Sequence, residues 1–255
     1  YGDAAEMQRL SAKYAGADQG KVTRVFGANF IGRMSGKVVE AFVAKADLLA
    51  ASPAYSDQSG VDWKTAAASA AKVLNHIGRV DGMDPTGWTW YCNVDDIENL
   101  SPTESPAEIL WRGERAKSLS LEEDNFPPTL YGNGRINPTQ NLVDAFPMLN
   151  GYPVSHLSGE YDENLPYANR DPRLEAYILY NGCKAGNTNK EIFTAADGTT
   201  NDALNKVVGR STRTGYYLRK LLRQDISLDP NAKADQYHYT PRIRYTEIFL
   251  AYAEA

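Results

Sequence analysis

Cysteine and histidine are scarce in this chain of 255 residues, which contains two cysteines and three histidines. Cys92 and Cys183 form neither a CxxC pair nor a metal-ligand spacing, and two cysteines are too few for a disulfide framework. We therefore expect two unpaired thiols that are buried or half-buried. His76, His156 and His238 stand apart in the sequence, so each is interpreted as a structural residue rather than a metal ligand or catalytic base.

The motifs of common enzyme classes are also missing. The sequence contains neither an HExxH metalloprotease motif nor a GxSxG nucleophile elbow. Gly32–Lys37 (GRMSGK) fails as a phosphate-binding loop, because Ile31 and Val38 occupy positions that require glycine and serine or threonine. These absences predict a protein without catalytic activity and without a cofactor or metal.

A basic excess and long apolar runs are lacking as well. The net charge of -5 argues against a nucleic-acid partner, which would require a basic face. No apolar run approaches the roughly 18 residues that a membrane-spanning helix needs. With 42% hydrophobic and 23% charged residues, the composition is that of an ordinary globular protein, in which tyrosine, at 16 residues, is the one excess.

Hydrophobic periodicity predicts a mainly helical chain. We expect helices over Gly32–Ala51, Asp62–Ile77 and Arg244–Ala255, with Asp62 as an N-cap and Gly78 as a stop signal. Their apolar faces are Val39, Phe42, Ala46 and Leu49; Trp63, Ala66, Ala67, Ala70, Val73, Leu74 and Ile77; and Tyr245, Ile248, Phe249, Tyr252 and Ala255. Small residues at Gly36, Ala41 and Ala44 allow a neighbouring helix to approach closely.

The second and third of these helices share the i, i+3, i+4, i+7 spacing of the first helix in tetratricopeptide repeats. Both chain ends lie in helix-like sequence, because no cap precedes Tyr1 and the last apolar stripe reaches Ala255 without a glycine or proline. We therefore expect a fragment that lacks both natural termini. The stripe over Arg244–Ala255 is then expected to bury partly against helices outside the fragment.

Between the helices, the pattern is weaker. We expect a loop over Ala15–Ile31 and a long irregular, aromatic-rich segment over Arg79–Arg135. Apolar residues alternate in Leu174–Tyr180, and Tyr216–Leu222 is rich in apolar residues, so these two segments are predicted to be short strands that pair.

The most specific part of the sequence starts at Asn137. Asn137-Pro138 and Asp171-Pro172 each offer an N-cap followed by proline at the first helical position, and Asn150-Gly151 supplies a turn between them. The blocks QNLVDAFPMLNGYP, NRDPRL, TGYYLRKLL and PRIRYTEIFLAYAEA, in this order, resemble the SusD/RagB family closely. The resemblance covers Asn137–Ala255, and Gly32–Ile77 more weakly.

This resemblance implies a mainly α fold: a tetratricopeptide-like helical scaffold with long loop-rich insertions and a few short strands. The chain would be a single, incomplete SusD-like domain, with scaffold helices in residues 1–78, an irregular insertion in 79–240 and a further scaffold helix starting in 241–255. Members of the family are non-catalytic lipoproteins, anchored by a lipid at the outer-membrane surface. They bind oligosaccharides or polysaccharides, in some cases peptides, and deliver them to a SusC-like TonB-dependent transporter.

The matching blocks are scaffold signatures, so the binding site has to be argued from composition. A sugar ring packs its C–H face on a flat aromatic ring while its hydroxyls bond polar neighbours. Candidate ligand-binding residues in the irregular region are Trp88, Trp90, Tyr91, Trp111, Tyr131, Asn133 and Arg135. The simpler alternative is that the tryptophans fill the space between loops and helices.

Two other function classes remain open. A tetratricopeptide-type adaptor would bind a peptide in a groove lined by asparagine and lysine. A secreted glycosidase would need two facing carboxylates in a cleft. Acidic residues are plentiful at Asp95, Asp96, Glu98 and 122–124, but solvated loop carboxylates are the simpler interpretation of them.

Overall fold

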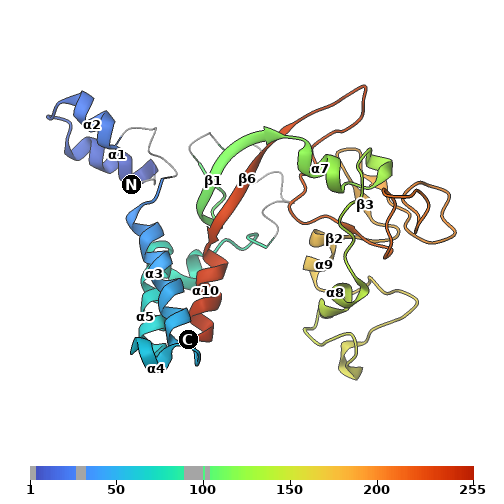
Figure 1. The fold of residues 1–255 in the computed structure, drawn as a ribbon, viewed down its shortest axis with the longest axis horizontal. Helices are drawn as coiled ribbons and strands as arrows, with labels where there is room; N and C mark the ends of the chain where they lie inside the picture. Colours follow the sequence, from blue (N-terminus) through green and yellow to red (C-terminus); the bar gives the residue numbers. More distant parts are fainter. Residues whose placement is uncertain (1–3, 27–32, 89–99, 101–103) are drawn as a thin grey trace. The chain divides into compact units, whose positions relative to one another are not determined.

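The computed structural model describes residues 4–26, 33–88, 100 and 104–255, which form two compact units (Figure 1). Unit 1 contains the described residues up to Trp88, those from 100 to Arg115, and Tyr239–Ala255; unit 2 is Ala116–His238. The division falls within two long strands that pair with each other, β1 (Ile109–Ser118) and β6 (Gln236–Arg244). Each unit is described by itself.

Strands β1 and β6 correct the sequence prediction, which treated 79–135 as irregular and assigned no strand to Gln236–Arg244. The strand β1 reads ILWRGERAKS, in which a glycine and four charged residues interrupt the apolar alternation expected of a strand. Its partner also follows more than a hundred residues later, so no hairpin signal links the two.

Unit 1 is helical, as predicted. Its elements are α1 (Ala4–Lys13), α2 (Gln19–Phe26), α3 (Gly36–Ala51), α4 (Ser56–Ser59), α5 (Trp63–Leu74), the 3₁₀ turns η2 (Asn75–Ile77) and η3 (Arg79–Gly82), and α10 (Tyr245–Glu254). Asp62 caps α5 as expected, because its carboxylate accepts the Thr65 N–H at 2.8 Å. The cap of α3 is Ser35, so this helix starts four residues later than predicted.

Helix α2 lies where the sequence predicted a loop. Asp18 Oδ1 accepts the N–H groups of Gly20 at 2.8 Å and Lys21 at 3.3 Å, which satisfies the first turn. Val22 is buried, whereas most of the described side chains around it are exposed. The sequence held two signals for this helix, the aspartate cap and the i, i+3, i+4 spacing of Val22, Val25 and Phe26, but the glycines on either side favoured the prediction of a loop.

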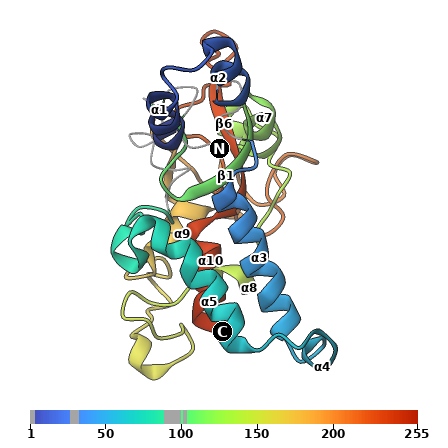
Figure 2. The ribbon, with the colours of Figure 1, turned by 90° about the vertical axis from the view of Figure 1, so that its left-hand side faces the viewer.

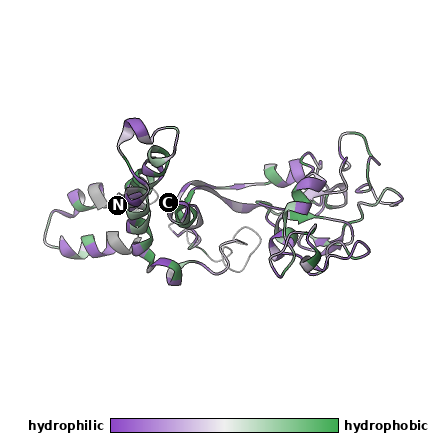
Figure 3. Cartoon of the chain, turned by 90° about the horizontal axis from the view of Figure 1, so that it is seen from below, coloured by the Kyte–Doolittle hydropathy of each residue, from purple (hydrophilic) through white to green (hydrophobic). Residues whose placement is uncertain are grey.

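Helices α3, α5 and α10 pack against one another and form the core of unit 1 (Figure 2). Ala41 and Ala44 are fully buried, which confirms that the small residues of α3 face its neighbours. The predicted apolar face of α3 is different, because Val39, Phe42 and Leu49 are 50%, 41% and 60% exposed. Figure 3, which colours the chain by hydropathy, shows hydrophilic and hydrophobic residues mixed in the helices near the two chain ends.

The start of α10 is held by a residue distant in sequence. Glu108 is buried, and its Oε1 accepts the Thr246 N–H at 3.2 Å and Arg244 Nε at 3.0 Å. Its backbone carbonyl accepts the Tyr245 N–H at 3.0 Å. A carboxylate at this end of a helix satisfies free N–H groups and opposes the positive pole of the helix dipole. Glu108 therefore replaces the missing local cap.

Unit 2 contains short elements joined by long loops. They are α7 (Ser120–Asn125), η4 (Pro128–Leu130), α8 (Gln140–Ala145), η5 (Leu157–Gly159), α9 (Pro172–Tyr177), β2 (Ile178–Leu179), β3 (Lys184–Ala185), β4 (Lys190–Glu191) and β5 (Tyr217–Leu218). Strands β2 and β5 pair antiparallel, with Ile178 opposite Leu218, which confirms the predicted pairing. The first part of the predicted strand is instead helix α9, because Asp171 caps it through the Arg173 N–H and Pro172 starts it.

Arg170 ties α8 to the loop that follows it. The guanidinium is buried and donates to the carbonyls of Val143 at 2.6 Å, Phe146 at 2.8 Å and Pro166 at 2.9 Å. The N-cap of α8 is Thr139 rather than the predicted Asn137. The Asn137 side chain instead donates to the Gly134 carbonyl and accepts the Arg213 N–H.

A buried carboxylate joins three segments of unit 2. Glu122, in α7, is fully buried, and its Oε1 lies 2.8 Å from the Arg223 backbone nitrogen and 3.0 Å from His238 Nε2. Within the described residues, Glu122 Oε2 and His238 Nδ1 have no hydrogen-bond partner. The Arg223 guanidinium pairs with Asp225 at 2.6 Å. Glu122 therefore holds α7, the turn at Arg223 and the start of β6 together.

Candidate functional site

Tyr131 has an unusual backbone and an exposed ring. It follows η4 with φ 66°, in the left-handed region that bulky side chains rarely adopt, and 46% of the residue is exposed. The backbone is fixed by bonds from Tyr131 N–H to the Pro128 carbonyl at 2.9 Å and from Gly132 N–H to the Pro127 carbonyl at 3.2 Å. Strained residues held in this way cluster at ligand-binding sites, so Tyr131 is the starting point of the candidate site.

A pocket of about 200 Å³ opens beside this ring. Its apolar lining comes from Phe126, Leu130, Ile226, Leu228, Ala232 and Ala234, and its polar lining from Thr129, Asn187, Thr188, Lys190, Ser227 and Asp229, with Tyr131 itself. Phe126, Leu130, Ile226 and Leu228 also belong to the main core of unit 2. The pocket therefore has a rigid apolar floor and a polar rim.

The hairpin of β3 and β4 forms one wall of this pocket. Gly186 adopts φ +75°, and a Cβ at this position would lie 2.8 Å from Leu130 Cδ2. Glycine is thus required both for the backbone conformation and for the close approach of the hairpin to η4. The Gly186 N–H also donates to Gln224 Oε1 at 3.0 Å. These contacts place Asn187, Thr188 and Lys190 at the pocket.

Charged residues of both signs lie at the pocket or next to it. Lys190 Nζ lies 5.6 Å from the ring centroid, within the range of a cation–π contact. Asp229 Oδ1 accepts the Asn231 N–H at 2.9 Å, which holds this carboxylate in its own turn. Asp202 is fully buried and accepts the Thr129 N–H at 2.7 Å; burial raises the pKa of its carboxyl, opposed by that bond and by Lys190.

Two of the tryptophans predicted as ligand contacts, Trp88 and Trp111, do not line this pocket. Trp88 is half-buried in unit 1, and Trp111 packs against the helical core of the same unit. Phe42 contacts the Trp111 ring edge-on at 5.7 Å, and the Arg242 guanidinium lies 4.7 Å from its centroid. This geometry favours the structural interpretation for Trp111. Trp90 and Tyr91 lie outside the described residues.

Asn133 and Arg135 share a segment with Tyr131 but do not line the pocket. Asn133 donates its backbone N–H to the Glu123 carbonyl at 2.9 Å, and Arg135 forms an exposed ion pair with Asp124 at 3.2 Å. Their role in binding stays a prediction. Of the lining, the sequence analysis found Tyr131 alone; the polar residues that it missed are Thr129, Asn187, Thr188, Lys190, Ser227 and Asp229. The one local signal was the polar run GNTNK between two short strands, which is typical of a hairpin turn.

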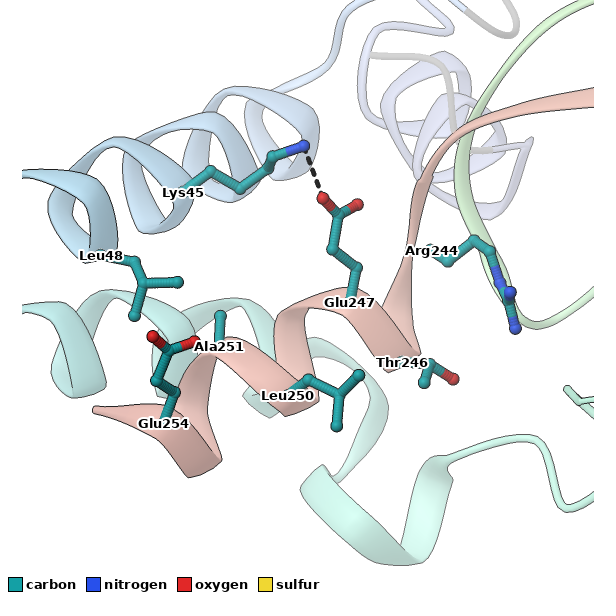
Figure 4. Close-up of a pocket in the computed structure, with 8 residues that line it drawn as sticks. All are labelled: Lys45, Leu48, Arg244, Thr246, Glu247, Leu250, Ala251 and Glu254. Atoms are coloured by element: carbon teal, nitrogen blue, oxygen red, sulfur yellow. Dashed lines mark ion pairs between the residues drawn. The ribbon is translucent and has the colours of Figure 1, made fainter. Parts of the chain in front are cut away.

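A second depression lies in unit 1, between α3 and α10 (Figure 4). It measures about 410 Å³ and is lined by Lys45, Leu48, Arg244, Thr246, Glu247, Leu250, Ala251 and Glu254. Lys45 and Glu247 face each other and form an ion pair at 2.6 Å. This lining contains no asparagine, and its lysine is already paired, so it lacks the polar residues expected of a tetratricopeptide-type peptide groove.

Each histidine has a structural partner. His76 pairs with Glu40 at 2.6 Å, His156 stacks on Tyr152 with centroids 4.8 Å apart, and His238 contacts Glu122. Within the described residues, no group of three or more histidine, cysteine or acidic side chains is placed to hold a metal ion. Cys183 is free and buried, as predicted; Cys92 lies outside the described part. No helix among the described residues has the length and apolar character needed to cross a membrane.

Comparison with known proteins gives a consistent assignment. The chain resembles a SusD-like carbohydrate-binding protein from Bacteroides fragilis with a TM-score of 0.62 and 20% identity, over 93% of this chain and 46% of that structure. A second SusD-like protein from the same organism matches with a TM-score of 0.61 and 24% identity, over 88% of this chain and 43% of that structure. The chain thus spans less than half the length of either structure. No curated protein matches it in sequence.

These structures share the fold: a mainly helical chain with long loops and few strands. The model of the SusD family matches residues 110–255, which is more than half of the sequence and includes the Tyr131 pocket and α10. The blocks that suggested this family, from QNLVDAF to RYTEIFLAYAEA, all lie within the matched range. The chain therefore belongs to the SusD family.

Proposed function

We propose that this chain is part of a non-catalytic glycan-binding protein, and that the pocket beside Tyr131 contacts the sugar. The observation that carries the proposal is the exposed Tyr131 ring, held in a strained backbone at the edge of a pocket with a polar rim. The ring offers a flat face for sugar C–H groups, and the amide, hydroxyl and charged groups of the rim suit its hydroxyls. A family member of similar fold is described as carbohydrate-binding, which supports the same ligand class.

The wider role is also part of the proposal. The protein captures oligosaccharides or polysaccharides at the cell surface, where a lipid anchor outside the sequence holds it at the outer membrane, and delivers them to a SusC-like TonB-dependent transporter. Family membership supports this role. Catalysis is not proposed, because hydrolysis of a glycosidic bond requires two carboxylates across the sugar and the pocket lining contains one, Asp229.

The test compares two tyrosines of equal exposure. Tyr131 and Tyr152 are 46% and 45% exposed, but Tyr152 stacks on His156 and does not line the pocket. A glycan array identifies ligands, and calorimetric titration then measures the affinity of each variant for the best one. Tyr131→Ala is expected to weaken binding by about 1–3 kcal/mol, roughly 5- to 150-fold, and Tyr152→Ala to leave it unchanged.

A second variant separates loss of the ring from loss of the fold. Tyr131→Asn also removes the ring, but asparagine tolerates the left-handed backbone, so this variant should melt no lower than the parent. The site is wrong if both Tyr131 variants bind the glycan as tightly as Tyr152→Ala does. The ligand class is wrong if no glycan binds at all.

A further inference from the structure

The Tyr131 pocket is small. Its volume of about 200 Å³ lies below the roughly 300–1,000 Å³ of pockets that enclose a drug-sized molecule. A long oligosaccharide does not fit within such a volume, whereas one sugar unit at a chain end or branch does. The polar groups at the rim therefore determine which single sugar unit binds best.

The charge nearest to the ring is Lys190. In the described part of the chain, no carboxylate forms an ion pair with its ammonium group, which lies over the Tyr131 ring and, from a longer distance, lowers the pKa of the buried Asp202 carboxyl. Two other lysines of unit 2 form ion pairs, Lys117 with Asp235 at 3.1 Å and Lys233 with Glu123 at 3.3 Å, whereas Lys220 resembles Lys190 in lying over a tyrosine ring, 4.7 Å from the Tyr177 centroid. The Lys190 ammonium is therefore a cation at the rim that forms no salt bridge within the described residues.

Two acids lie near this cation and neither forms an ion pair with it, although the second carboxylate oxygen of Asp202 has no hydrogen-bond partner within the described residues. Asp229 lines the pocket but is held in its turn by the Asn231 N–H at 2.9 Å. Asp202 is fully buried, and its Oδ1 takes the Thr129 N–H at 2.7 Å. A ligand anion that reaches Lys190 thus meets an ammonium group beside an aromatic face, with Asn187 and Thr188 as neutral neighbours and the Asp229 carboxylate in the same lining.

We propose that the pocket recognises a single acidic sugar unit of the uronic acid type. The sugar ring stacks on Tyr131, its carboxylate pairs with Lys190, and its hydroxyls bond Asn187 and Thr188. A charge-assisted bond between ammonium and carboxylate then provides the preference over a neutral sugar of the same shape. This inference rests on the proposed function and narrows its substrate class.

The experiment removes the charge from the ligand and from the protein in turn. Methyl glycosides of glucuronic, galacturonic and mannuronic acid are each titrated beside the corresponding methyl ester, with binding followed by ligand-observed NMR. For at least one sugar, the acid should bind about tenfold more tightly than its ester, and added salt should reduce this ratio. Lys190→Gln should abolish the ratio and Lys190→Arg should retain it. Lys184→Gln, an exposed lysine on the paired strand β3 that does not line the pocket, is the matched control and should also retain it.

The outcomes separate this inference from the function on which it rests. If acid and ester bind equally and both lose affinity in Tyr131→Asn, the acidic preference is refuted while glycan binding at the pocket stands. The same conclusion follows if neither binds but a neutral glycan does so in a Tyr131-dependent way. If no glycan binding depends on Tyr131, the proposed site fails and the inference fails with it.

Discussion

Replacing Glu122 with leucine removes the acceptor of two hydrogen bonds inside unit 2. The Arg223 N–H, which donates at 2.8 Å, belongs to a residue that is 2% exposed, so it has no access to water once the carboxylate is gone. Leaving a buried donor without a partner costs about 1–3 kcal/mol. The His238 side chain is 14% exposed, so water partly replaces its hydrogen bond to Glu122. Losing this bond therefore costs about 1 kcal/mol of the free energy of unfolding. The expected destabilisation is therefore about 2–4 kcal/mol.

Two further variants give this prediction its controls. Glu122→Gln keeps an oxygen acceptor of the same shape for both donors, so it should cost about 1 kcal/mol. Glu123→Leu removes the next carboxylate in the chain, whose ion pair with Lys233 is about half exposed on both sides, and exposed pairs contribute about 0–1 kcal/mol.

Urea unfolding of the whole chain measures these differences. All four tryptophans lie outside Ala116–His238, so a loss of near-ultraviolet circular dichroism without a change in tryptophan fluorescence is the signal to follow for unit 2. With a slope of about 2 kcal/mol per molar urea, Glu122→Leu should lower the midpoint by about 1–2 M. A midpoint no lower than that of Glu123→Leu would show that the buried carboxylate does not hold unit 2 together.

Two other changes test the pocket wall and the buried thiol. Gly186→Ala should lower the free energy of unfolding by about 1–2 kcal/mol, because the residue needs φ +75° and the new methyl would meet Leu130. The same change should weaken glycan binding, since it displaces one wall of the pocket. Unchanged affinity would mean that the hairpin wall is not needed. Burial raises the pKa of the Cys183 thiol to about 11, so at pH 8 roughly 0.1% is thiolate. Peptide mass spectrometry follows the alkylation of Cys183 in the folded protein. The rate should be low at pH 8 and should rise about tenfold per pH unit up to about pH 11. Fast labelling at pH 8 would contradict this prediction.

Local signals in the sequence predicted local structure well. Asp62 marked the start of the second scaffold helix, and Gly78 marked the end of the 3₁₀ turn that follows it, because a cap and a left-handed stop act within one turn; the α-helix itself ends at Leu74, three residues earlier than predicted. Asp171-Pro172 marked the start of α9 in the same way, although the apolar alternation after it led to the wrong prediction of a strand from Leu174. The cap of α10 was beyond such reasoning, because Glu108 reaches it from more than a hundred residues earlier.

The candidate site shows the same limit. Tyr131 was identified from composition, but its pocket draws on three separate segments: 126–131, 187–190 and 226–234. Their proximity is set by the shared core of Phe126, Leu130, Ile226 and Leu228, which no spacing rule relates. Conversely, Trp111 has a ring of the kind that stacks on sugars. In the structure, however, this ring packs against the core of unit 1, whose helices are rich in alanine. Composition does not distinguish these two uses of an aromatic ring.

The division of β1 and β6 between the two units bears on the order in which the chain folds. Pairing these strands in an otherwise unfolded chain would close a loop of about 120 residues, at a free-energy cost of about 4 kcal/mol. The described part of unit 2 is one continuous segment, and contacts within it join its ends: Lys117 to Asp235, and Glu122 to His238. Once unit 2 has folded, β1 and β6 extend from it next to each other. Little further loop closure is then needed to pair the rest of the two strands. Helix α10 then reaches α3 and α5 late, so tryptophan fluorescence, which reports on unit 1, should change after the tyrosine signal during refolding.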